Sequence, residues 1–228
     1  MTLMSSYVIH SRKSTALPHA MIDALGRAMT SRDGLTDAHA RRVERFAAAL
    51  ADEAGINDNG MLEAIEAAAL LHDIGKLGIP DRLLNKPGPL TPDEYEQVKQ
   101  HTIIGADILA AVPVPGPLAL IVRHHHENWD GTGYPDGLEG EMIPVGARVL
   151  SIVDCYDALT SDRPYRRALS QGSAIAMIHQ RRGTMYDPAI VDAFLRIVQR
   201  LRSGPERDRA SRPQLRTQAA LRLQARAV

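Results

Sequence analysis

The sequence predicts an all-α fold in which helices pack around one core. Apolar residues recur at helical spacing in several segments, and capping residues stand at the starts of two of them. No stretch of useful length alternates apolar and polar residues as a half-buried β-strand does. With 228 residues, of which 44% are hydrophobic and 24% charged, the chain can bury a substantial core.

Composition excludes several classes of protein. The 27 basic and 27 acidic residues balance, so we expect no stable binding to nucleic acid. Cys155 is the only cysteine, which rules out an intramolecular disulfide and a thiolate zinc cluster and fits a reducing compartment. No apolar run reaches the length of a signal peptide or a membrane span, so a cytoplasmic protein without a membrane segment is expected.

The first two expected helices lead to a pair of polar residues. Residues 36–54 form one helix, because their apolar positions follow a helical period and Gly55 is placed to end it. A second helix begins near residue 59 and continues through an apolar stripe into the sequence His-Asp-Ile-Gly-Lys. His72 and Asp73 should then lie in its last turns.

The middle of the chain alternates loops with helices. Residues 80–90 hold three prolines and a glycine and are expected to be a loop. Thr91–Glu94 has the pattern of a capping box with proline at the first helical position, and it should start a helix whose third turn carries His101. Another helix should follow over residues 117–126 and end in a run of histidines, before a long glycine-rich loop at residues 130–140.

The last part of the fold is expected to be helical, with one exposed turn at Ser161–Arg166. Asp187 should cap the final helix, since it directly precedes Pro188 at the first helical position. The three helices expected here span residues 145–159, 173–182 and 188–201.

Histidines are concentrated where a metal site would need them. Five of the nine lie in one 55-residue stretch, beside Asp73 and Asp154 in apolar helices. A single histidine is more often a hydrogen-bonded core residue than a ligand, but a buried aspartate costs several kcal/mol unless it is paired or metal-bound. Those helices hold too few Lys or Arg residues to pair with both carboxylates. Nitrogen and oxygen donors without sulfur suit iron, manganese or zinc.

Three segments together resemble the HD-GYP phosphodiesterases, a branch of the HD-domain metallohydrolases. They are HDIGK at residues 72–76, HHENWDGTGYP at residues 125–135 and SIVDCYDALTSDRPYR at residues 151–166. The resemblance covers about residues 33 to 200. It implies an HD-domain helical bundle with a GYP loop at residues 130–140, which binds two or three metal ions and hydrolyses cyclic di-GMP.

The resemblance also implies the ligands. Asp73 would bridge two ions, and His39 matches an early histidine that some members use. Members with a third ion carry a glutamate four residues before that histidine, where this chain has Leu35, so a third ion is not expected. The implied metal ligands are His72, Asp73, His101, His125, His126 and Asp154, with His39 as a further candidate.

The histidine run contains one residue more than the family pattern needs. His125 and His126 are favoured as ligands because they stand immediately before Glu127. His124 is then a surface residue or a neighbour of the ligands. The alternative is that the pair is shifted by one position.

Other residues are candidates for chemistry and substrate binding. Two ions bridged by Asp73 can activate a water for attack on phosphorus. Lys76 follows one turn later, and its ammonium can neutralise phosphate or assist the leaving oxygen. Tyr134, Arg163 and Arg166 are substrate candidates, through a ring for a base and planar forks for phosphate. The alternative roles are a solvated surface lysine for Lys76, a packed loop aromatic for Tyr134 and surface salt bridges for the two arginines.

The expected function is hydrolysis of cyclic di-GMP to linear pGpG, with further cleavage to GMP as an extension, using two divalent ions, iron or manganese. One alternative keeps the metals but acts on another cyclic dinucleotide or a nucleotide. A second is a non-catalytic module that binds a cyclic dinucleotide or a partner such as a diguanylate cyclase.

Three regions are expected along the chain: an arm or leading helix at residues 1–32, the HD-GYP catalytic domain at 33–202, and an arginine-rich flexible tail at 203–228. An arm of this length has no room for a receiver or similar sensory module. A stand-alone domain is therefore expected, regulated by a signalling partner, by expression or by the arm.

Overall fold

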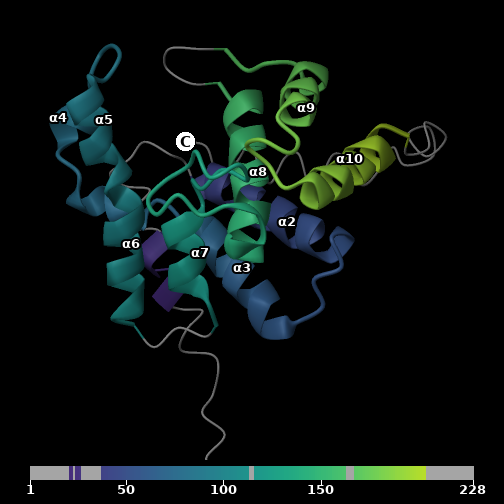
Figure 1. The fold of residues 1–228 in the computed structure, drawn as a ribbon, viewed down its shortest axis with the longest axis horizontal. Helices are drawn as coiled ribbons and strands as arrows, with labels where there is room; N and C mark the ends of the chain where they lie inside the picture. The colour runs from purple at the N-terminus through teal and green to yellow at the C-terminus, as the bar shows by residue number, and fades with distance from the viewer. Residues whose placement is uncertain (1–20, 23, 27–36, 113–115, 163–166, 204–228) are drawn as a thin grey trace, which may run out of the picture.

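The computed structural model describes residues 21–22, 24–26, 37–112, 116–162 and 167–203, and in these residues it is helical without a β-strand. Figure 1 shows α8 running through the middle of the molecule, with the other helices arranged around it. The elements are α2 (Asp37–Glu53), α3 (Asn59–Leu71), η1 (Ile74–Gly78), α4 (Asp81–Leu84), α5 (Pro92–Lys99), α6 (His101–Ala110), α7 (Leu118–His124), η2 (Gly140–Met142), α8 (Val145–Thr160), α9 (Gln171–Gln180) and α10 (Pro188–Ser203).

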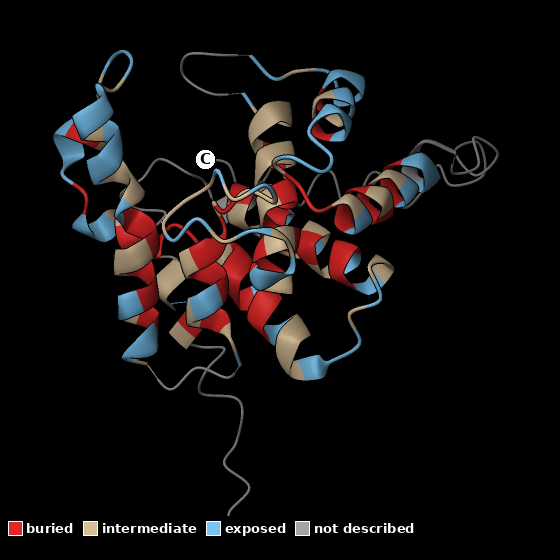
Figure 2. Cartoon of the chain, viewed as in Figure 1, coloured by how far each residue is buried: buried red, intermediate tan, exposed pale blue. Residues whose placement is uncertain are grey.

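One hydrophobic core holds the bundle together, and it lies where α2, α3, α7, α8 and α10 meet (Figure 2). The central helix α8 packs against all four of these neighbours and against α9. The side chains at the centre are removed from water completely, which supplies the main stabilising free energy of such a bundle. Those with no exposed surface include Leu50, Ile65, Ile121, Leu150 and Phe194.

The turn after α3 differs from the expected helix end. α3 ends at Leu71, His72 is its C-cap, and Asp73 precedes the short 3-10 helix η1, so the prediction that both residues lie in the last turns of the helix is wrong. Gly75 explains the tighter turn. A Cβ on Gly75 would stand 1.8 Å from the carbonyl oxygen of His101, so the turn packs backbone against backbone on α6.

The single helix predicted to carry His101 is two helices. α5 ends at Lys99 and α6 begins at His101. At the junction the ring Nδ1 of His101 donates to the carbonyl oxygen of Val98 at 2.8 Å, and the hydroxyl of Thr102 donates to that of Lys99 at 3.0 Å. Side-chain donors thus take carbonyls of the last turn of α5, which competes with continuation of the helix.

Residues 80–90 are not wholly a loop, because α4 (Asp81–Leu84) forms within them. Pro80 is its N-cap, a position where a missing N–H costs nothing, and Leu83 is buried. The predicted capping box at the start of α5 is confirmed. Glu94 N donates to Thr91 Oγ1, and Thr91 N donates to a carboxylate oxygen of Glu94.

The last helices follow the prediction closely. α8 extends one residue beyond the expected end, and α9 begins two residues early because Ser170 caps it by accepting from Ser173 N. Asp187 accepts from Ala189 N at 2.7 Å, which confirms it as the cap of α10. Its other carboxylate oxygen accepts from Arg148 at 2.7 Å, an ion pair that ties α8 to the start of α10.

The predicted arm and tail fall largely outside the described residues. In the arm, residues 21–22 and 24–26 are helical, and Ile22 is buried in the core. Residues 204–228 of the tail are not described. Among the described helices, none combines the length and the apolar character that crossing a membrane requires.

A substitution at Gly75 tests the close packing of η1 on α6. Gly75→Ala should lower the free energy of unfolding by on the order of 1 to 3 kcal/mol, because the added methyl meets backbone that cannot move aside. For Gly172→Ala, in α9, the one described contact of the new methyl within 4 Å is a serine hydroxyl, so this variant should stay within about 1 kcal/mol of the wild type. Urea unfolding measures both, and equal stability of the two variants would contradict the packing.

Candidate metal centre

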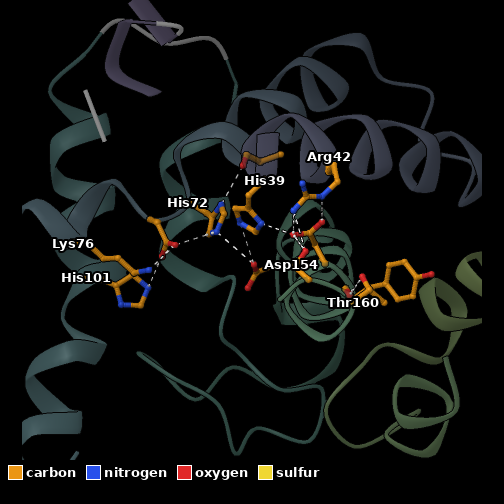
Figure 3. A network of polar contacts seen from close by, with 12 residues as sticks. His39, Arg42, His72, Lys76, His101, Asp154 and Thr160 are labelled. Atoms are coloured by element: carbon orange, nitrogen blue, oxygen red, sulfur yellow. Dashed lines mark hydrogen bonds and ion pairs between the residues drawn. The ribbon is translucent and has the colours of Figure 1, made fainter. Parts of the chain in front are cut away.

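Two groups of candidate ligands form at the inner ends of the helices. In the first, nitrogen atoms of His101, His125 and His126 lie within 4.8 Å of one another. In the second, His39 from α2, His72 from the end of α3 and Asp154 from α8 are equally close. Figure 3 shows His39, His72 and Asp154 facing one another, with His101 and Lys76 beyond His72. These are candidate His/Asp metal sites.

Asp73 lies between the two groups. Its Oδ1 is 3.7 Å from Nε2 of His101, a member of the first group. Its Oδ2 is 3.4 Å from Nε2 of His72, a member of the second. One carboxylate thus offers an oxygen to each group, which is the arrangement that a bridging ligand requires.

A repeated hydrogen bond orients three of the histidines. In each, the ring Nδ1 lies against the backbone carbonyl oxygen three residues earlier in the chain. Because a carbonyl oxygen can only accept, Nδ1 carries the proton and Nε2 keeps its lone pair for the centre of the site. The distances are 3.2 Å from His72 to Ala69, 2.8 Å from His101 to Val98 and 2.7 Å from His125 to Val122.

The nitrogens that face the centre fit a metal ion. Among the described residues, Nε2 of His101 and Nε2 of His125 are buried and find no hydrogen-bond partner. A buried polar atom without a partner costs about 1 to 3 kcal/mol. A divalent ion would accept both lone pairs, and the carboxylates of Asp73 and Asp154 would balance its charge.

Electrostatics favours the protonation states that bind metal. Burial holds the pKa of His125 well below its ordinary value and lowers that of His126 to about 4. Both rings are therefore neutral near pH 7. Burial alone would raise the pKa of Asp73, but the ammonium of Lys76 and the neighbouring imidazoles of His72 and His101 hold that pKa well below the ordinary value. Asp73 is a carboxylate.

His39 is oriented by a carboxylate rather than by the backbone. Its Nδ1 lies 2.5 Å from Oδ2 of Asp157, and its Nε2 lies 3.9 Å from Oδ1 of Asp154. Arg42 in turn donates to both oxygens of Asp157, at 2.6 and 3.0 Å (Figure 3). Burial opposes ionisation of Asp157, but hydrogen bonds from His39 and Arg42 lower its pKa below the ordinary value.

Asp157 has a role that the sequence reading did not assign. The sequence places it only within the helix expected over residues 145–159. The available signal is its spacing: it follows Asp154 by three residues in α8, so both carboxylates lie on one side of the helix and face α2. Carboxylates that hold the second nitrogen of a metal-binding histidine fix the ring and raise its basicity.

His124 is separate from the two groups. Its Nε2 is 3.6 Å from Asp136 of the loop, whose carboxylate already accepts from Arg123 at 2.7 and 2.8 Å. His124, Glu127 and Asp136 are close enough to hold a cation, but both carboxylates are engaged elsewhere. This third cluster therefore fastens the loop to α7.

Glu127 organises the GYP loop, a role that was also missed. Although its side chain is buried, it accepts hydrogen bonds from three successive backbone amides of the loop, those of residues 136–138, at 2.8 to 3.2 Å. Gly133 lets the loop pack against the backbone, since a Cβ there would lie 2.2 Å from Asn128 N. The folded loop places the ring of Tyr134 5.0 Å from that of His126.

The remaining candidates fall into two sets. Lys76 stands in η1, where its ammonium lies 2.8 Å from Oδ2 of Asp73, so the structure brings it to the ligand groups. Arg163 and Arg166 lie outside the described residues. Their assignment to substrate stays a prediction from the sequence.

The family model described as HD domain matches residues 23–190. The chain belongs to the HD-domain family. This HD domain is 43% identical over 180 residues to the cyclic di-GMP phosphodiesterase response regulator RpfG of Xanthomonas campestris, covering 77% of this chain and 47% of that one. It is 41% identical over 179 residues to a cyclic di-GMP phosphodiesterase of Thermotoga maritima, covering 78% and 48%. The chain thus spans about half the length of these relatives.

Solved structures support the same fold. A cyclic GMP-AMP specific phosphodiesterase of V. cholerae aligns with a TM-score of 0.65 at 18% identity, over 81% of this chain and 49% of that one. The HD domain of the L. monocytogenes phosphodiesterase PgpH, in complex with cyclic-di-AMP, aligns at 0.54 and 21% identity, over 78% and 96%. The all-α HD-domain bundle and the resemblance read from the sequence are confirmed.

Asp157→Asn tests the orientation of His39. The amide keeps the shape of the carboxylate but removes its charge, so affinity for a divalent ion should fall by about 10- to 100-fold. Asp192→Asn is the matched control, because Asp192 is also paired twice with an arginine, Arg182, at 2.9 and 2.8 Å on the surface. Competition with a chelator measures both affinities. An equal affinity in the two variants would show that Asp157 does not act on the metal site.

Proposed function

We propose that this HD domain is a phosphodiesterase that hydrolyses cyclic di-GMP to linear pGpG and uses two divalent metal ions. The observation that carries this proposal is the pair of ligand groups on either side of Asp73, one of which contains the two buried Nε2 atoms, of His101 and His125, that find no partner among the described residues. Relatives at 38% to 43% identity are named as cyclic di-GMP phosphodiesterases, one of them as probable, which supports the choice of substrate.

The residues present fit two ions. When bound, such a pair activates a water and neutralises charge on the phosphate. Nitrogen and oxygen donors favour iron or manganese, and Leu35 offers no donor for a third ion. The proposed ligands are His101, His125 and His126 on one side, His39, His72 and Asp154 on the other, and Asp73 shared between them.

Lys76 is proposed to act in the reaction. Its ammonium is held near the shared carboxylate at 2.8 Å, so a phosphate beside Asp73 lies within its reach. There it can donate to a phosphate oxygen and stabilise the charge that develops on the leaving oxygen. Tyr134, Arg163 and Arg166 are proposed to hold the nucleotide, Tyr134 from its position against His126 and the arginines from their place in the sequence.

A second substrate has a specific observation behind it. Relatives at 32% to 34% identity are named 3'3'-cGAMP-specific phosphodiesterases. Another cyclic dinucleotide is therefore the alternative with most support. A non-catalytic binding module has less support, because the chain carries both the candidate metal ligands and Lys76, which a module without turnover would not require. Onward cleavage to GMP and a signalling partner are further parts of the proposal.

The proposed function is tested by turnover. Protein loaded with manganese, or with iron without oxygen, should convert cyclic di-GMP to pGpG in a chromatographic assay. Asp73→Asn should lower kcat by more than about a hundredfold, because it removes the charge shared by both ligand groups. Asp192→Asn serves as the control and should match the wild type. Absence of hydrolysis of cyclic di-GMP at full metal loading would contradict the proposal.

The histidine run gives a second test, of which residues are ligands. His125→Ala should abolish binding of one ion and most of the turnover, because its buried Nε2 faces the centre. His124→Ala should cost far less, since its ring faces Asp136 of the loop. Metal content and kcat are measured for both. Equal damage in the two variants would mean that the ligand pair is wrongly assigned.

A further inference from the structure

An exposed tyrosine stands at the outer side of the site. Tyr95, on α5, has 47% of its surface exposed, although its ring is large and mostly apolar. Its ring centroid lies 6.3 Å from that of Tyr134, at an angle of 80°. Figure 1 shows α5 at the edge of the bundle, above α6. Tyr95 thus extends the aromatic surface of Tyr134 toward solvent.

A lysine accompanies both rings. The ammonium of Lys99 lies 5.2 Å from the ring centroid of Tyr95 and 5.4 Å from that of Tyr134. Lys99 follows Tyr95 by four residues, so the two share one face of α5. Its ion pair with Glu96 joins it to a carboxylate whose side chain is 65% exposed. Exposed pairs contribute little, so Lys99 can exchange this partner for a ligand.

These groups run outward from the proposed metal centre. The ring of His126 lies 5.0 Å from that of Tyr134, at an angle of 33°, and Lys99 and Tyr95 follow. A cyclic dinucleotide with a phosphate at the ligand groups must place its bases to the side of them. The surface formed by Tyr134, Lys99 and Tyr95 begins beside His126, one of the proposed ligands, and so lies to one side of them.

We infer that Tyr95 and Lys99 recognise a nucleobase of the substrate and favour guanine over adenine. An aromatic ring stacks on any base, with about 1 to 3 kcal/mol per base. Selection comes from the ammonium. Guanine presents two acceptors, O6 and N7, on one edge, whereas adenine presents an amino donor beside N7, which cannot accept from Lys99. The inference rests on the proposed function and adds to it the residues that choose the base.

Tyr95 and Lys99 stand on a helix whose start is fixed by hydrogen bonds. The capping box of Thr91 and Glu94 fixes the start of α5, and Lys86 reaches the same Glu94 carboxylate at 2.5 Å. Tyr95 follows directly in the first turns of this helix. A recognition group on a fixed helix loses little freedom when a ligand binds.

The competing interpretation is that the cluster only fastens the GYP loop to α5. A fastening contact would affect guanine and adenine nucleotides equally, and its loss would lower thermal stability. A recognition site would change the ratio of their affinities. The two interpretations therefore differ in a quantity that can be measured directly.

Binding of GMP and AMP to the metal-loaded full chain separates them, because neither carries a diester that could be hydrolysed. Calorimetry on the wild type should show tighter binding of GMP. Lys99→Met should weaken GMP binding about tenfold and change AMP binding less than threefold, and Lys99→Arg should restore part of the preference. Tyr95→Leu should weaken both about five- to tenfold.

Arg182→Met is the control, since it also removes an ion-paired cation, one that pairs with Asp192 on the surface, and it should leave the GMP to AMP ratio unchanged. An unchanged ratio in Lys99→Met, or no measurable binding of GMP by the wild type, would overturn the inference even if cyclic di-GMP is hydrolysed. Absent hydrolysis with the base preference intact would instead count against the proposed function alone.

Discussion

The hydrogen bond from a histidine Nδ1 to a backbone carbonyl three residues earlier is the interaction on which the candidate metal centre depends. His72, His101 and His125 stand at helix ends, where carbonyl oxygens lack partners from a following turn. Each ring takes one such carbonyl and thereby satisfies the helix end, fixes its own tautomer and turns Nε2 inward. In this fold, the same hydrogen bond caps the end of a helix and orients a candidate ligand.

The rest of the site follows from bringing those helix ends together. Gly75 lets the turn after α3 touch the backbone of α6, and that contact places Asp73 beside His101. Gathering buried imidazoles and carboxylates is costly without a cation, because desolvation and like charges oppose it. The hydrophobic core around α8 supplies the stability that holds this arrangement, and Arg42 and Lys76 offset the charge of Asp157 and Asp73.

Capping residues and apolar periods predicted most of the helices, and the histidines and aspartates of the candidate site were visible in the sequence. The sequence did not predict the features that depend on side chains forming hydrogen bonds with distant or irregular backbone. The break before His101 arises from side-chain donors at the junction, and Glu127 acts through amides that only the folded loop presents. The contact of Asp157 with His39 could be recognised only once α2 was known to lie beside α8. The contact of Tyr95 with Tyr134 likewise depends on the loop of Tyr134 lying beside α5.

We propose that one carboxylate, Asp73, joins the two ligand groups into a single centre. Electron paramagnetic resonance of protein loaded with two equivalents of manganese tests it most directly, since ions that share a ligand are magnetically coupled. We expect a coupled signal that Asp73→Asn abolishes. A spectrum of two independent manganese ions in the wild type, with both equivalents bound, would contradict it.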